Sequence, residues 1–153
     1  CTPMDSNWKF EFQDVYNVLC KYLYCTFNIE DVKFNMNTYN SIIEYLIDYI
    51  NIDLRPFRFL YERKVLLKYI INEVAKVDSL LLTNENLSCF EQIERESNLI
   101  FMLAIKYTIK PTIELQTKII DKLKKMYLLE KESLNTVLTK IESVLGGDCI
   151  ELL

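Results

Sequence analysis

Apolar residues recur at spacings of three and four along most of the chain, which is the pattern of helices that bury one face. The proline positions support this pattern, because Pro56 suits the first turn of a helix and the residue before Pro111 avoids helical geometry. Five of the helices that the pattern predicts span about 8–25, 38–52, 56–81, 111–128 and 132–145.

A sixth predicted helix, at about 88–108, contains a stretch with no polar side. The side chains of Leu99–Ile105 are all apolar and point in every direction around a helix, so we expect this part to be buried on all sides. It is far shorter than the roughly 20 apolar residues of a membrane span. We therefore predict an all-α domain of about six helices, packed as an orthogonal or irregular bundle around this central helix.

Length and composition agree with one helical domain. The chain has 153 residues but only two glycines and three prolines, which argues against the many turns of a sandwich or barrel. We expect residues 1–153 to be a single domain excised from a larger protein, with a lead-in at 1–7 and a tail at 146–153. The alternative is a fragment of an α-solenoid made of helical pairs, because pairs starting near 8, 56 and 111 are loosely periodic.

Charge and cysteine content narrow the function classes. The net charge is −4, and residues 1–54 carry −5 while residues 55–82 carry +3. A negative total argues against broad binding to nucleic-acid phosphates, which needs clustered basic residues. The five cysteines are odd in number and irregularly spaced, so they predict no disulfide framework and favour a reducing compartment, the cytoplasm or the nucleus.

The residue types that carry most enzyme chemistry are missing. The chain has no histidine, which removes the commonest general base and the commonest metal ligand. There is no glycine-rich phosphate loop. The carboxylate pairs Glu91/Glu94 and Glu130/Glu132 fall on faces that we expect to be solvated. The sequence therefore predicts no enzymatic activity, no catalytic residue, no metal site and no cofactor.

Two features favour a binding role. The apolar arc of the helix at 38–52 is wider than the roughly 100° stripe that one packing surface needs, and Tyr45, Tyr49 and Ile52 extend one edge of it. The start of the next helix is rich in the Arg and Tyr side chains that interfaces favour; it comprises Arg55, Arg58, Tyr61, Arg63, Lys64 and Lys68. Packing against the first or third helix is the simpler explanation of the first feature, and a solvated helix face is the simpler explanation of the second.

A small helical domain with one apolar central helix is similar in outline to Bcl-2-like proteins. The resemblance implies binding of an amphipathic helix from a partner protein. The chain departs from that family where the central helix opens, because Asn98-Leu-Ile-Phe stands in place of a motif of the Asn-Trp-Gly-Arg type.

The leading hypothesis is a non-enzymatic protein–protein interaction module, a scaffold or adaptor that binds a partner helix or peptide. Its predicted apolar and Tyr/Arg surface comprises Tyr45, Tyr49, Ile52, Arg58 and Tyr61. A Bcl-2-like helix-binding regulator and a structural α-solenoid segment are the alternatives. Nucleic acid is not an expected partner, no membrane span is predicted, and a homo-oligomer is compatible with the wide apolar arcs.

Overall fold

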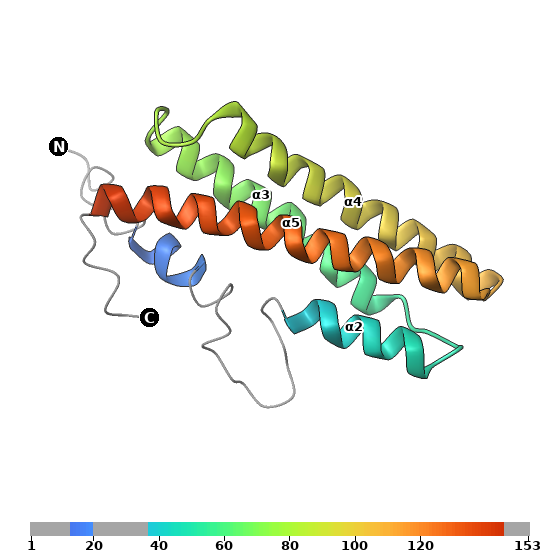
Figure 1. The fold of residues 1–153 in the computed structure, drawn as a ribbon. Coiled ribbons are helices and arrows are strands. Elements are labelled where there is room, and N and C mark those ends of the chain that lie inside the picture. The colour runs from blue at the N-terminus through green and yellow to red at the C-terminus, as the bar shows by residue number, and fades with distance from the viewer. Residues whose placement is uncertain (1–12, 20–36, 146–153) are drawn as a thin grey trace.

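The computed structural model describes residues 13–19 and 37–145, and all regular structure in these ranges is helical (Figure 1). Residues 13–19 are helical, and they are followed by α2 (Asn37–Asp48), α3 (Arg55–Val77), α4 (Asn84–Ile109) and α5 (Ile113–Leu145). The predicted all-α fold class is confirmed. The expected lead-in at 1–7 and tail at 146–153 lie outside the described residues, as does most of the helix expected at 8–25.

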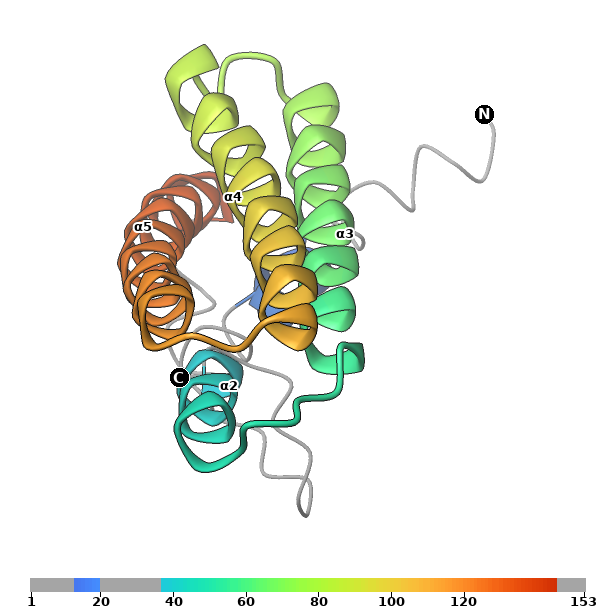
Figure 2. The same cartoon turned by 90° about the vertical axis from the view of Figure 1, so that its right-hand side faces the viewer.

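The three long helices form an arc that two short helical segments close. In the end view of Figure 2, α3, α4 and α5 follow one another around the arc, and α2 lies across its open side. Figure 1 shows α2 along one half of the bundle and residues 13–19 along the other half. The described helices therefore pack around one another as a bundle, and they do not stack as the separate helical pairs of the solenoid alternative.

Local sequence explains where α3 and α4 begin. Pro56 occupies the first turn of α3, where a missing N–H group leaves no hydrogen bond unmade. The first turn of α4 carries a reciprocal cap, because the Thr83 hydroxyl accepts from the Asn86 N–H group and the Asn86 side chain accepts from the Thr83 N–H group. This cap starts α4 at Asn84, four residues before the predicted start.

The predicted break between the last two helices is wrong, because α5 is one continuous helix of 33 residues. The expected break at about 129–131 falls on Leu129, Glu130 and Lys131, which are all helical. The side chain of Glu130 is buried on the inner face of α5. Glu130 therefore belongs to the buried face of α5, and the helix does not end there.

The central-helix prediction is wrong on one point, because α4 has an exposed side. Its predicted one-sided face is buried as expected, and this face includes Phe90, Ile93 and Ile100. On the outer side, however, 44% of Leu99 and 53% of Met102 are exposed. Among the described helices, α4 packs mainly against α3 and α5, and the side that faces neither of them is open. It is one wall of the bundle and not its centre.

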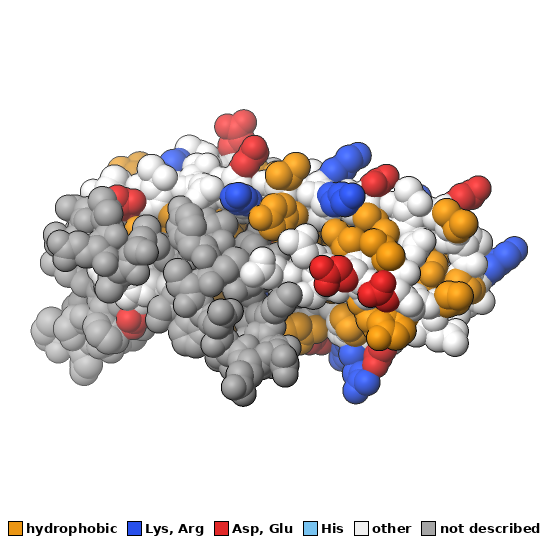
Figure 3. Space-filling view, turned by 60° about the horizontal axis from the view of Figure 1, so that its bottom comes forward, with side chains coloured by type: hydrophobic (Ala, Val, Ile, Leu, Met, Phe, Trp, Pro, Cys, Tyr) orange, Lys and Arg blue, Asp and Glu red, His pale blue; other side chains and the backbone are white. Residues whose placement is uncertain are grey.

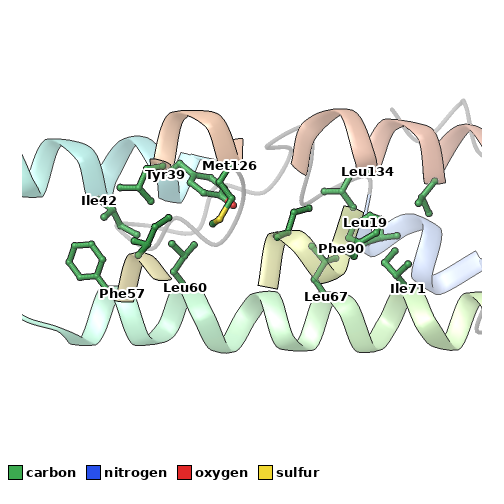
Figure 4. Close-up of a cluster of buried hydrophobic side chains, with 14 of the residues drawn as sticks. Leu19, Tyr39, Ile42, Phe57, Leu60, Leu67, Ile71, Phe90, Met126 and Leu134 are labelled. Atoms are coloured by element: carbon green, nitrogen blue, oxygen red, sulfur yellow. The ribbon is translucent and has the colours of Figure 1, made fainter. Parts of the chain in front are cut away.

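The hydrophobic core extends along α3 in two groups (Figure 4). One group lies beside α2 and includes Tyr39, Ile42, Phe57, Leu60 and Met126. The other lies beside residues 13–19 and includes Leu19, Leu67, Ile71, Phe90 and Leu134. The two groups therefore correspond to the two short helical segments that close the bundle.

We predict that two neighbouring leucines of α4 differ sharply in their contribution to stability. Leu103→Ala should lower the free energy of unfolding by about 2–5 kcal/mol, because Leu103 is buried and its removal leaves a cavity. Leu99→Ala should lower it by less than about 1 kcal/mol, because Leu99 is partly exposed. Urea unfolding followed by circular dichroism measures both, and equal losses would contradict the exposed side of α4.

Candidate functional site

The most unusual polar cluster of the described residues is a buried ion pair between α3 and α5. The Lys64 side chain is 2% exposed and that of Glu130 is 0% exposed, and Lys64 Nζ lies 2.8 Å and 3.1 Å from the two carboxylate oxygens. The hydroxyl of Tyr39, from α2, donates a hydrogen bond to the same carboxylate. Lys64 Nζ also lies 4.9 Å from the centre of the Tyr39 ring, within range of a cation–π contact.

Burial is the largest influence on the ammonium group of this cluster. It lowers the pKa of Lys64 below the usual value for lysine, and the charge and hydrogen bond of Glu130 act in the opposite direction. Since neither side chain is open to solvent, a substrate in solution has no access to the pair. The cluster therefore joins α2, α3 and α5 inside the bundle.

The sequence analysis was wrong about the burial of both members of the pair. Lys64 was expected on a solvated basic face and Glu130 on a solvated acidic one, yet both are buried. The signal that identifies them is position, because Lys64 follows Leu60 by four residues and Glu130 follows Met126 by four. Each charged residue therefore continues an apolar face, a pattern that favours a buried partner of opposite charge.

We predict that removing one partner destabilises the fold far more than removing both. Lys64→Met leaves the Glu130 carboxylate buried without its cation, so it should cost about 3–5 kcal/mol of unfolding free energy. Adding Glu130→Gln removes the charge and keeps an oxygen that can accept from the Tyr39 hydroxyl. The double variant should therefore recover most of the loss in a urea titration.

Lys68→Met is the matched control, because it removes a lysine of the same helix from a partly exposed pair with Glu94. It should cost less than about 1 kcal/mol. If the double variant is no more stable than Lys64→Met alone, the loss comes from packing and not from an unpaired charge.

A second candidate site is the corner between α2 and α3, residues 45–55, which is held by side-chain hydrogen bonds. The Tyr45 hydroxyl accepts from the Asp53 N–H group at 2.6 Å. The Asp53 carboxylate accepts from the N–H group of Arg55 at 2.8 Å and from its Nε at 2.7 Å. The hydrogen bonds from Arg55 hold the pKa of Asp53 below its usual value. The rings of Tyr45 and Tyr49 lie 5.2 Å apart at 39°, so the corner has a defined shape.

This corner belongs to a surface that exposes large apolar side chains. The Gln116 side chain donates a hydrogen bond of 2.7 Å to the carbonyl of Leu46, which places the start of α5 against the end of α2. The α2–α3 corner and the α4–α5 turn thus lie at the same end of the bundle (Figure 1). Their exposed apolar residues, which we call the apolar end, are Ile47 (61% exposed), Tyr49 (57%), Ile50 (71%), Ile109 (80%) and Ile113 (80%).

Figure 3 shows this region in a space-filling view. Hydrophobic side chains gather toward the right-hand end of the molecule, with acidic and basic side chains among them. Single exposed apolar residues are common on protein surfaces, but several on adjoining segments are typical of interaction sites.

The structure describes all five residues that the sequence analysis placed in one binding surface. Tyr49 is exposed and stacks on the half-buried Tyr45, while Ile52 is partly buried and packs against the core. On α3, Arg58 is exposed and pairs with Glu62, and Tyr61 is half-buried. Among the described residues, no hydrogen bond, ion pair or ring contact joins Arg58 or Tyr61 to the two tyrosines of the corner.

Four of the apolar-end residues were not singled out as binding residues: Ile47, Ile50, Ile109 and Ile113. The wide apolar arc of α2 was the available signal for the first two, because one packing surface cannot cover it. Ile109 and Ile113 flank Pro111, so their position on either side of a turn was visible in the sequence. That this turn meets the end of α2 depends on tertiary packing.

A cleft of about 360 Å³ between α4 and α5 is a weaker candidate. It is lined by Gln92, Glu96, Lys122, Lys125, Met126 and Leu129. Lys122 Nζ lies 3.2 Å from a carboxylate oxygen of Glu96, so the two charges across the cleft largely neutralise each other. Lys125 adds a second positive charge, so the lining has a net charge of +1 and only a slight preference for an anion.

Two further findings concern the described residues only. No three cysteine, aspartate or glutamate side chains come together there as a metal-binding group. None of the helices in that part of the chain combines the length and the hydropathy that crossing a membrane requires.

Comparison of the chain with protein-family models, with curated proteins and with solved structures finds no match. The apolar end is a surface where large apolar side chains of two adjoining turns remain exposed after the bundle has packed.

Proposed function

We propose that this chain is a non-enzymatic helical module for protein–protein interaction, and that it binds a helix or peptide of a partner at its apolar end. The observation that carries the proposal is the exposure of five large apolar side chains on adjoining segments at one end of the bundle. Burying such side chains against a partner gains about 25 cal/mol for each Å² of apolar surface.

The rigidity of the apolar end supports this role. Tyr45 and Asp53 hold the α2–α3 corner, and Gln116 holds the start of α5 to the end of α2. A surface that already has its bound shape loses little conformational entropy on binding. The corner is therefore suited to bind a partner without first rearranging.

Within this surface, Tyr49 is the natural anchor, because a tyrosine contributes apolar area and a polar tip. The Tyr45 ring packs beside the Tyr49 ring, and Ile52 packs the corner against the core. Arg58 and Tyr61 lie on α3 and are proposed as contacts at the margin of the surface, where charged side chains contribute little energy but favour particular partners.

The chemistry of the chain agrees with a binding role. It has no histidine, and the Lys64–Glu130–Tyr39 cluster is closed to solvent. A scaffold or adaptor needs surface and stability only. We place it in a reducing compartment, the cytoplasm or the nucleus, where the free thiol of Cys89 would stay reduced. The exposed side of α4 argues against the Bcl-2-like alternative, whose outline has an apolar central helix.

The test is selection of peptides from a displayed library of random sequences against the purified chain. Selected peptides should carry apolar residues at the i, i+3 and i+4 spacing of a helix face, and they should bind with micromolar affinity in fluorescence anisotropy. Ile50→Asp should weaken their binding at least tenfold, about 1.4 kcal/mol, because it places a charge in the centre of the apolar end.

Leu80→Asp is the matched control, because Leu80 is also an exposed apolar residue but lies in the α3–α4 turn at the opposite end of the bundle. Peptide binding to this variant should match binding to the unmodified chain. The proposal fails if no peptide is selected, or if Ile50→Asp binds the selected peptides as well as the control does.

A further inference from the structure

The charged residues beside the apolar end indicate which molecule binds there. We propose that the apolar end binds a second copy of this chain about a two-fold axis. This inference rests on the proposed function, because it assigns a partner to the same surface.

The α2 side of the apolar end is acidic. Glu44 and Asp48 are exposed on α2, and neither makes an ion pair within the described residues. No lysine or arginine occurs from Asn37 to Leu54. The third acid of this stretch, Asp53, is already paired with Arg55. Two unpaired negative charges therefore lie beside Ile47, Tyr49 and Ile50.

The α4 side of the apolar end is basic. Lys106 and Lys110 are exposed at the end of α4, and neither makes an ion pair in the part of the chain that the structure describes. Ile109 lies between them in sequence. On the neighbouring first turns of α5, the exposed Glu114 is followed four residues later by the exposed Lys118, which balances its charge.

An apolar centre with an acidic side and a basic side is complementary to itself. In a two-fold dimer the same patch of both copies takes part, and each residue pair occurs twice. Rotation by 180° places apolar residues against apolar residues, and it places Glu44 and Asp48 of one copy against Lys106 and Lys110 of the other. A foreign partner would need to carry the same pattern by coincidence, whereas a second copy carries it by construction.

The size of the surface sets the expected strength. A stable interface buries about 800 Å² on each partner, usually as an apolar core with a polar rim. Five apolar side chains supply the core, and the charged residues beside them supply the rim. We expect a weak dimer with a dissociation constant on the order of 10 µM. Salt should weaken it, because the rim charges are solvent-exposed.

Sedimentation velocity of the full chain from about 1 µM to about 500 µM brackets this dissociation constant. The chain should pass from monomer to dimer over this range. Asp48→Lys and Lys110→Glu should each weaken the dimer at least tenfold, because each places like charges opposite each other. The double variant Asp48→Lys/Lys110→Glu exchanges the two charges, so it should restore the dimer.

Asp121→Lys is the control for the charge change, because Asp121 is exposed on α5, away from both ends of the helix. It should dimerise like the unmodified chain. A chain that stays monomeric at the highest concentration overturns the inference, as does a double variant that is no better than the single ones.

The two experiments distinguish a failure of the dimer inference from a failure of the proposed function. If the chain stays monomeric but binds displayed peptides in a way that Ile50→Asp abolishes, then only the assignment of a second copy is wrong. If the dimer forms with the expected charge dependence but no peptide is selected, then the surface serves self-association and the binding of foreign partners is wrong.

Discussion

The ion pair between Lys64 and Glu130, with the Tyr39 hydroxyl, is the interaction that joins α2, α3 and α5. Two opposite charges without access to water must find each other and the remaining hydrogen-bond partners, or the fold carries a large desolvation penalty. Here the partners come from three helices, because Tyr39 of α2 donates to the carboxylate that Lys64 of α3 binds on α5. A pair of this kind adds little net stability, but it disfavours any arrangement of these helices that leaves one of the two charges buried without the other.

The consequences extend to the apolar end. The Tyr39 hydroxyl ties the first turns of α2 to α5, and Gln116 ties the last turn of α2 to the start of α5. Helix α2 is therefore held at both ends against one partner helix. Its apolar arc is wider than that contact, so Ile47 stays exposed, as do Tyr49 and Ile50 just after the helix. The proposed binding surface thus results from how α2 is attached.

Helix α4 is positioned by a different means. Its Glu94 pairs with Lys68 of α3 on one side, and its Glu96 pairs with Lys122 of α5 on the other. These pairs are partly exposed, so each contributes little to stability. Together they favour one rotation of α4 about its axis, which keeps Ile100 inside and Met102 outside.

The sequence by itself determined the helical class and most of the core faces, because helical periodicity is a local property of neighbouring residues. The buried faces of α3 and α4 follow this pattern, and Pro56 and Pro111 correctly bound their helices. Local pattern also indicated that α2 carries more apolar surface than one neighbour can cover.

Only the tertiary structure decided which charged residues are buried and which apolar residues are exposed. Whether Lys64 and Glu130 point to water or to each other depends on a contact between residues 66 positions apart, which no local window contains. The same pair explains why α5 continues through a charged stretch. The exposed side of Leu99 and Met102 has the same origin, because an all-apolar stretch is buried only where neighbouring helices exist to cover it.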